Sequence, residues 1–150
     1  MSTLAYNKRA KFDYFLEDTY EAGMVLSGGE VKSIRAGRVS LADSFVRIKN
    51  NEAFLINAHI NPYNFADNRA YDPRHERKLL LHRKQIEQLA SKTGGKNTTI
   101  VPVSMYEKNN TIKLQIAIGR GKKQYDKRAA IKEHELKAKV SQITRAYKHK

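Results

Sequence analysis

Hydrophobic and polar residues alternate along much of the chain, with the period of two that is typical of β-strands. In residues 12–26 the alternation is imperfect, with most apolar side chains on even positions and an interruption near Asp18. This pattern predicts one long strand, or two strands around a bulge. Residues 99–106 and 111–118 alternate most clearly, on either side of a polar turn, and predict a hairpin.

Two other segments carry helix and turn signals. Ser27 and Glu30 have the spacing of a capping box, and Gly37 is placed to end the short helix that this box begins. Strands are predicted at residues 45–49 and 53–57. They are joined by a pair of asparagines, which tolerate the positive φ of a tight hairpin turn.

The order of these elements predicts the fold class. Residues 59–77 have no clear period and are interpreted as a long loop, followed by a second helix that ends near Ser91. About six short antiparallel strands with two or three short helices favour a mainly β fold, an OB-like closed antiparallel barrel. We assign this barrel to residues 1–121.

Residues 122–150 have a different pattern and are assigned to a basic C-terminal tail. Leu136, Val140, Ile143 and Tyr147 form a narrow apolar stripe at helical spacing, and no glycine or proline follows Gly121. Such a stripe is too thin to stabilise an isolated helix in water, where packing normally supplies the stability. We therefore expect the tail to be disordered alone and to fold into a helix on a partner.

The charge of the chain indicates a polyanionic partner. Of the net charge of +14, +8 lies in residues 120–150, which carry 11 Lys/Arg and 3 Asp/Glu. A basic body with a denser basic tail favours nucleic acid first and an anionic membrane surface second. No stretch approaches the ~20 apolar residues of a membrane span, so we expect no membrane partner and a cytoplasmic location.

The sequence contains no pattern typical of catalysis or metal binding. Cysteine is absent, which excludes disulfides, zinc knuckles and thiol catalysis. The five histidines show neither His-x-x-x-His nor His-Glu-x-x-His spacing. Gly119-x-Gly121-Lys122 lacks the full phosphate-loop pattern, so we interpret it as a hinge. The sequence therefore predicts no enzymatic activity, no metal and no cofactor.

The N-terminal region combines cations with aromatic rings, a mixture that holds phosphates and stacks bases. Asn7, Lys8 and Arg9 precede Tyr14, whose ring either stacks on RNA or packs the barrel. Glu21 also has two interpretations. It is either an ion-paired group on an exposed strand face or a carboxylate that accepts hydrogen bonds from a base amino group.

Several strings of the sequence together resemble one family, the SsrA-binding proteins (small protein B). The strings follow the family's order over nearly the whole chain. They are NKRA at 7–10, YEAG at 20–23, GEVKSIRAG at 29–37, RKLLL at 77–81 and GKKQYDKR at 121–128.

The resemblance implies an RNA-binding protein of trans-translation with an OB-like barrel and no enzymatic activity. It implies that the barrel binds the tRNA-like domain of tmRNA and delivers this RNA to stalled 70S ribosomes. It further implies that the tail enters the decoding centre and the empty mRNA channel, where it contacts small-subunit rRNA. We expect the protein to be a monomer.

The resemblance also implies roles for individual residues. The tmRNA-facing positions would be Asn7, Lys8, Arg9, Tyr14, Glu21, Leu80, His82, Gly119, Gly121, Lys122 and Lys123. The ribosome-facing positions would be Tyr125, Asp126, Lys127, Arg128 and Ile143. At Tyr125 the expected role is stacking on a base of the decoding centre. His82 departs from the asparagine of other members, although both side chains can donate and accept hydrogen bonds.

Three other interpretations fit the composition alone. The first is a general RNA chaperone or a ribosomal protein with a basic extension. The second is an RNA-modifying enzyme or nuclease with an unrecognised site, and the third is a membrane-surface protein. Competition between tmRNA, tRNA and random RNA separates the first from a tmRNA-binding protein, and incubation with labelled RNA tests the second.

Overall fold

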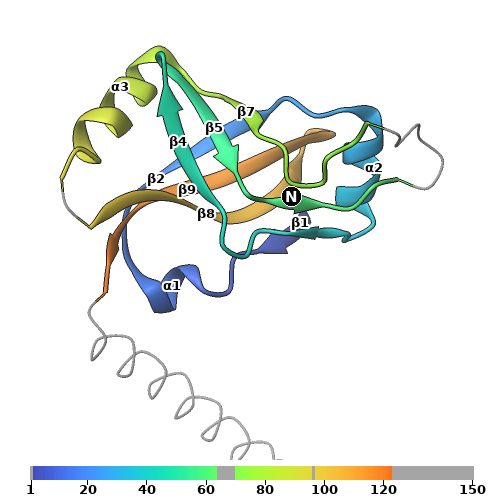
Figure 1. The fold of residues 1–150 in the computed structure, drawn as a ribbon, viewed down its shortest axis with the longest axis horizontal. Coiled ribbons are helices and arrows are strands. Elements are labelled where there is room, and N and C mark those ends of the chain that lie inside the picture. Colours follow the sequence, from blue (N-terminus) through green and yellow to red (C-terminus); the bar gives the residue numbers. More distant parts are fainter. Residues whose placement is uncertain (1, 64–69, 96, 123–150) are drawn as a thin grey trace, which may run out of the picture.

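The structure, a computed structural model, describes residues 2–63, 70–95 and 97–122 (Figure 1). Within these ranges there are three helices, α1 (Ala10–Asp13), α2 (Gly28–Arg35) and α3 (Arg83–Lys92). The same ranges contain nine strands, which are β1 (Ser2–Tyr6), β2 (Tyr14–Met24), β3 (Val39–Ser40), β4 (Phe45–Lys49), β5 (Glu52–Ile56), β6 (His59–Ile60), β7 (Arg77–Leu80), β8 (Thr98–Lys108) and β9 (Thr111–Gly121). The predicted mainly β class is confirmed.

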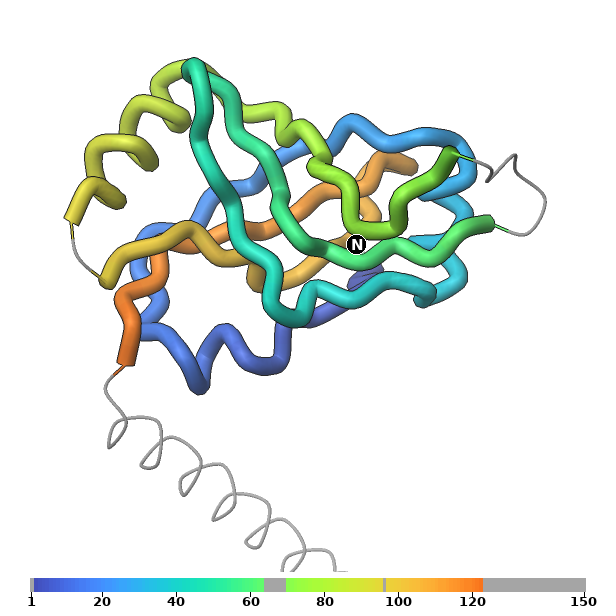
Figure 2. Tube along the Cα trace, in the orientation of Figure 1, coloured from blue at the N-terminus to red at the C-terminus, as the bar shows by residue number. Residues whose placement is uncertain are grey.

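Six of the strands close into an antiparallel ring in the order β8-β4-β5-β7-β2-β9, because β9 pairs with both β2 and β8. Figure 2 shows β2 and β9 running side by side, although the two strands are far apart in the sequence. Two joints of the ring are short. Val46 opposite Ile100 is the single residue pair between β4 and β8, and β7 meets β2 through two pairs.

The core lies inside the ring and is built from alternate positions of the strands. Leu55, Leu79 and Leu114 are almost fully buried there. Ile34 of α2 and Leu89 of α3 belong to the same cluster, and these two helices lie at opposite ends of the sheet (Figure 1). The alternation read from the sequence therefore marks the inner face of the ring.

The first predicted strand segment is partly wrong. Residues 12 and 13 belong to α1, where the amide groups of Phe12 and Asp13 donate to the carbonyl of Arg9 at 3.1 and 2.9 Å. A single helical turn is too short to show a period of its own, so its apolar residue merged with the strand pattern. The bulge predicted near Asp18 is confirmed, because the register between β2 and β9 shifts between Glu17 and Thr19.

The capping box at the start of α2 is confirmed. The Ser27 hydroxyl accepts from the amide of Glu30 at 3.2 Å, and Oε1 of Glu30 accepts from the amide of Ser27 at 3.1 Å. At the other end Gly37 adopts φ +77°, which suits a glycine. The predicted asparagine turn is also confirmed, since Asn50 and Asn51 both have positive φ between β4 and β5.

Part of the predicted loop at residues 59–77 is ordered by pairing and by one buried ion pair. β6 pairs with β3, and Arg77 already belongs to β7. Arg77 is 1% exposed and donates to Oε2 of Glu30 at 2.9 Å and to the carbonyls of Ala58 and Pro73 at 2.7 and 2.8 Å. Two-residue strands carry too few residues to show a period, so the sequence pattern missed them.

No helix in the described ranges is long and apolar enough to cross a membrane. The described residues also contain no cluster of His, Cys, Asp or Glu that could hold a metal ion. The predicted C-terminal tail, apart from Lys122, lies outside the described residues. Lys123, Tyr125, Asp126, Lys127, Arg128 and Ile143 therefore have no structural position here.

Candidate nucleic-acid interface

One row of residues crosses the outer face of four neighbouring strands. Tyr106 of β8 lies opposite Lys113 of β9, Lys113 lies opposite Gly23 of β2, and Gly23 lies opposite Leu80 of β7. Directly opposed residues in antiparallel strands point to the same side. We call Tyr106, Lys113, Gly23 and Leu80 the outer row.

Leu80 is the apolar end of the outer row. Its side chain is 53% exposed, an unusual state for a leucine in a strand. Gly23 makes this placement possible, because a Cβ at position 23 would lie 3.3 Å from Cβ of Leu80. The same Cβ would lie 3.7 Å from Nζ of Lys113. An exposed apolar side chain and an ammonium group therefore lie close together above one glycine.

Glu21 lies beside the outer row and is held from two sides. The hydroxyl of Tyr106 donates to its Oε2 at 2.5 Å, and Nζ of Lys108 lies 3.4 Å from the same oxygen. The Tyr106 hydrogen bond, aided by Lys108, holds the pKa of Glu21 below its usual value despite partial desolvation. Desolvation, followed by the bond to Glu21, raises the pKa of Tyr106 to about 12. Near neutral pH the pair is therefore a carboxylate and a protonated phenol.

His82 is the N-cap residue that precedes α3, next to the end of β7. Its backbone N–H donates to Oε1 of Gln85 at 3.1 Å, which fixes the first turn of the helix. The ring is exposed, two residues beyond Leu80. The structure thus brings Glu21 and Leu80, two of the predicted tmRNA-facing residues, onto one face of the neighbouring strands β2 and β7, and His82 follows β7 before α3.

A second group of predicted residues lies where β9 ends, next to α1. Gly119 faces the ring of Tyr14, because a Cβ at position 119 would be 3.0 Å from Cγ and Cδ1 of that ring. The amide of Gly121 donates to the carbonyl of Asn97 at 2.7 Å. Lys122 donates through its amide to the carbonyl of Asp13 and through Nζ to the carbonyl of Lys11. These contacts attach the end of β9 to α1.

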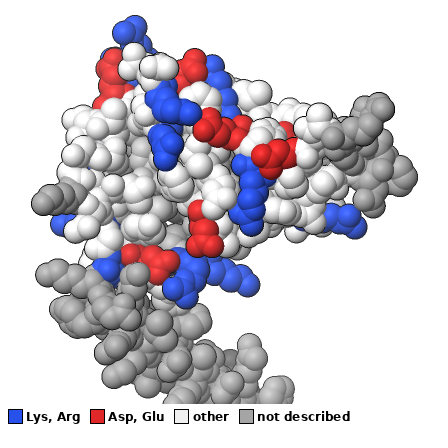
Figure 3. All heavy atoms as spheres, viewed as in Figure 1, with Lys and Arg blue, Asp and Glu red and all other residues white. Residues whose placement is uncertain are grey.

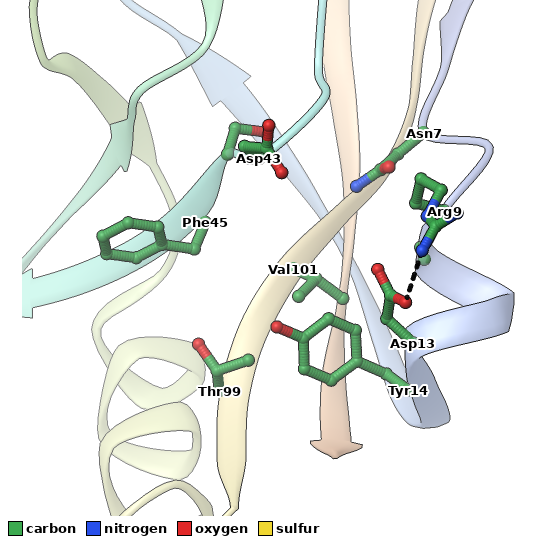
Figure 4. A pocket seen from close by; sticks show the side chains of 10 residues that line it. Asn7, Arg9, Asp13, Tyr14, Asp43, Phe45, Thr99 and Val101 are labelled. Atoms are coloured by element: carbon green, nitrogen blue, oxygen red, sulfur yellow. Dashed lines mark hydrogen bonds and ion pairs between the residues drawn. The ribbon is translucent and has the colours of Figure 1, made fainter. Parts of the chain in front are cut away.

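Tyr14 also lines a hollow of about 430 Å³ between α1, the start of β4 and β8 (Figure 4). Its ring reaches toward Thr99 and Val101 across this hollow. The position of the ring therefore supports the second interpretation of Tyr14, packing against the body, although the residue remains partly exposed. Both interpretations remain compatible with a half-buried ring.

Asn7 and Arg9, predicted to contact RNA, both make contacts within the protein. The side-chain amide of Asn7 donates to the carbonyl of Pro102 at 2.9 Å, and its backbone amide donates to Val103 at the same distance. Arg9 forms an exposed ion pair with Asp13 at 3.3 Å, visible as the dashed line in Figure 4. Lys8 between them is exposed. Asn7 therefore also helps to fix the N-terminal segment along β8.

Cations and acidic groups are interspersed on the face of the body shown in Figure 3. Many described cations pair with a carboxylate, as Lys92 does with Asp18 at 2.6 Å and Arg120 with Glu17 at 2.7 Å. Exposed pairs of this kind contribute little to stability, typically about 0–1 kcal/mol. These pairs do lower the local positive electrostatic potential. A phosphate contact needs an unpaired ammonium group, and such groups therefore occur at only some positions of this surface.

Three residues beside Glu21 were not among the predicted site residues. Lys113 of β9 lies between the buried Ile112 and Leu114, whereas Tyr106 of β8 is itself buried beside Met105 and Lys108 is exposed at the end of β8. The alternation along β9 could have assigned Lys113 to the outer face, but β8 has no such alternation around Tyr106 and Lys108. The strand register that brings them next to Glu21 and Leu80 joins segments far apart in the chain. No local sequence pattern could therefore reveal it.

Comparison with known proteins decides the family. The family model described as SmpB protein matches residues 4–146. The chain belongs to the SmpB family. The resemblance predicted from the sequence is thereby confirmed.

Members of the SmpB family are similar to this chain over nearly its full length. An SsrA-binding protein of Thermobifida fusca is 50% identical over 143 residues, covering 95% of this chain and 89% of its own. An SsrA-binding protein of Rubrobacter xylanophilus is 47% identical over 150 residues, covering 100% of this chain and 98% of its own.

A solved structure shares the fold. It is described as "tmRNA-SmpB: a journey to the center of the bacterial ribosome", and it superposes with a TM-score of 0.69. The two chains are 38% identical, with 87% of this chain and 95% of the solved one covered. The closed antiparallel arrangement of this SmpB-family chain is therefore the fold of a family member studied with tmRNA and the ribosome.

Proposed function

We propose that this protein binds the tRNA-like domain of tmRNA and delivers that RNA to stalled 70S ribosomes in trans-translation. The observation that carries the proposal is the relative named SsrA-binding protein that matches all 150 residues at 47% identity. The solved family member described with tmRNA and the bacterial ribosome supports the same partners. The proposed site of action is the cytoplasm, and the protein acts as a monomer without catalysing a reaction.

The face around the outer row has the chemistry that a folded RNA requires. Lys113 supplies an ammonium for a phosphate, which gives affinity without sequence information. Leu80 supplies an exposed apolar surface for a ribose or the face of a base. Glu21 supplies an acceptor for base or ribose donors, and the exposed His82 follows β7 two residues beyond Leu80. We therefore place the tRNA-like domain on β7, β2 and β9.

The group at the end of β9 is proposed as a second tmRNA contact. Gly119 and Gly121 keep side chains away from the backbone there, and Tyr14 presents a partly exposed ring. Nζ of Lys122 lies 4.9 Å from the centre of the Phe15 ring, which is 46% exposed. A cation on an aromatic ring is a common arrangement where proteins hold single-stranded nucleic acid. Asn7, Lys8, Arg9 and Lys123 complete the proposed tmRNA contacts.

The proposed ribosome contacts lie in the C-terminal tail. Asp126, Lys127 and Arg128 would act in the decoding centre, and Tyr125 would stack on a base of small-subunit rRNA there. Ile143 would lie on the apolar face of a helix in the empty mRNA channel. The support for these roles is the match of the SmpB family model through residue 146.

Competition binding tests the proposal. Labelled tRNA-like domain is bound to the protein, and unlabelled tmRNA, ordinary tRNA and random RNA are added as competitors. We expect tmRNA to compete far better than the other two. Equal competition by random RNA would instead identify a general RNA chaperone.

A charge variant extends this test to the outer row. Lys113→Gln should lower the slope of log affinity against log salt by about one, because one phosphate contact is lost. Lys32→Gln is the matched control, since Lys32 lies on α2 with its Nζ over the ring of Tyr63. An unchanged slope for Lys113→Gln would remove this lysine from the interface.

A further inference from the structure

The Glu21 carboxylate is fixed more firmly than an exposed glutamate on a strand normally is. Tyr106 is only 8% exposed, so its ring is held by the sheet while its hydroxyl reaches across β9 to Glu21. The 2.5 Å oxygen–oxygen distance is at the short end for a bond between a hydroxyl and a carboxylate. Lys108 adds a second contact, which is cationic, at 3.4 Å from Oε2 and 3.5 Å from Oε1.

This arrangement determines which groups Glu21 can bind. An ionised carboxylate only accepts hydrogen bonds, and it offers about four acceptor positions on two oxygens. Tyr106 occupies one position on Oε2, and Nζ of Lys108 lies at 3.4–3.5 Å from both oxygens. The remaining positions suit a hydrogen-bond donor, and their negative charge repels a phosphate. The ammonium group of Lys113 nearby provides a phosphate contact instead.

We propose that Tyr106 and Lys108 hold Glu21 as a fixed acceptor that recognises a donor group of the RNA, either a base amine or a ribose 2′-hydroxyl. Tyr106 is in this sense a positioning residue for RNA recognition. The inference rests on the proposed function, because it assigns a role within the tmRNA-facing surface. It adds a residue from β8 that the sequence had not indicated, together with the chemistry of the group recognised.

Positioning has a physical benefit that a free side chain lacks. A mobile glutamate loses rotamer freedom when it binds, and this loss subtracts from affinity. The hydrogen bond from Tyr106 restricts the rotamers of Glu21 before the RNA binds. Removing its hydroxyl should weaken RNA binding even though the hydroxyl itself need not touch RNA.

A double-mutant cycle tests this role in the full-length protein. Tyr106→Phe should weaken binding of the tRNA-like domain roughly threefold to tenfold, and Glu21→Gln about tenfold or more. In the Glu21→Gln background, Tyr106→Phe should have little further effect, because it acts through the carboxylate. Tyr20→Phe is the matched control, since it removes a hydroxyl from the same sheet that bonds Gln88 of α3 at 3.4 Å.

Modified RNAs identify the donor. One set replaces single riboses by 2′-deoxyribose, and another removes single base amino groups. The proposal expects one such change to weaken binding to the wild-type protein and to have no effect on Glu21→Gln. Full additivity of Tyr106→Phe and Glu21→Gln, or an equal effect of every modification on both proteins, would overturn it.

The outcomes also separate this inference from the proposed function. A wild-type protein that prefers tmRNA over random RNA, combined with an additive cycle, would leave tmRNA binding intact and remove the positioning role. A wild-type protein without that preference would contradict the proposed function itself. Thermal unfolding of each variant shows whether a loss of binding comes from loss of the fold.

Discussion

Single glycines decide where two exposed side chains of this protein can lie. Gly23 lies beneath Leu80 in the outer row, and Gly119 lies beneath Tyr14 at the end of β9. In both cases the missing Cβ leaves space for a neighbouring side chain to cross a strand. The exposed surface at each position therefore depends on a residue that contributes no side chain to it.

Gly119→Ala should be destabilising and should displace Tyr14. The new Cβ would lie 3.0 Å from two ring atoms, closer than an ordinary contact, and such overpacking typically costs about 1–3 kcal/mol. Urea unfolding gives the free energy of unfolding. Gly28→Ala is the control, because nothing lies within 4 Å of the position of its Cβ.

The cause of that effect can be checked in a second background. Tyr14→Ala removes the ring, so adding Gly119→Ala to it should cost much less than in the wild type. An equal cost in both backgrounds would show that the ring is not what Gly119 accommodates.

At the scale of elements, α2 is tied to β7 through one carboxylate. Oε1 of Glu30 accepts from the Ser27 amide, and its Oε2 accepts from Arg77. Burial raises the pKa of Glu30, but the Ser27 amide and the Arg77 guanidinium outweigh it and leave the pKa below its usual value. One side chain thus caps a helix and neutralises a buried cation.

Glu30→Gln should destabilise the protein far more than Ser27→Ala. The glutamine leaves Arg77 buried without a counter-charge, which typically costs about 3–5 kcal/mol. Ser27→Ala removes only a cap, worth about 1 kcal/mol. Chemical unfolding of both variants measures the difference, and equal losses would mean that Glu30 acts only as a cap.

The same pair predicts a pH dependence. Because the pKa of Glu30 is lowered by folding, its contribution to stability is complete above the ordinary pKa of a glutamate and is lost as the pH falls through the folded value. Glu30→Gln should therefore flatten the acid side of the stability profile. A variant with the same acid profile as the wild type would contradict this assignment.

Local signals in the sequence predicted some elements, and long-range pairing decided the others. The capping box, the asparagine turn and the bulge near Asp18 involve residues within a few positions of one another, so their chemistry is visible in the sequence. β1 depends on its partner β8, since Ser2 lies opposite Glu107. α1 is a single turn. Neither has a pattern long enough to be recognised alone.

The residues of the candidate site were also predicted only in part. Glu21, Leu80 and His82 came from the family resemblance, and the pairing of β2 with β7 places Glu21 and Leu80 on one face. Tyr106 and Lys113 were missed because a register across β8, β9, β2 and β7 is needed to place them beside Glu21. Sequence patterns assign a residue to a face of its strand, whereas neighbours on that face depend on the closure of the ring.

At the scale of the whole molecule, the proposed function assigns tmRNA to the body and the ribosome to the tail. Deleting residues 129–150 should leave the affinity for the tRNA-like domain nearly unchanged, because the proposed contacts all precede Ala129. The same deletion should abolish tagging on stalled ribosomes. Binding is measured with the isolated domain, and tagging in a translation reaction stopped without a stop codon.

The control for this deletion is Glu21→Gln in the full-length protein, which should lose affinity for the RNA and keep the tail. Loss of RNA affinity in the truncated protein would contradict the division between body and tail. Normal tagging by the truncated protein would remove the tail from ribosome rescue.

The two short joints of the ring divide it into halves of three strands each, β4-β5-β7 and β2-β9-β8. Such joints are where local opening of a fold costs least. An RNA lying on Leu80 and Glu21 touches both halves across the joint between β2 and β7. Because a ligand that binds only the closed arrangement stabilises it, the RNA would act as a clamp. Its stabilising effect would extend to the other short joint, where Val46 faces Ile100.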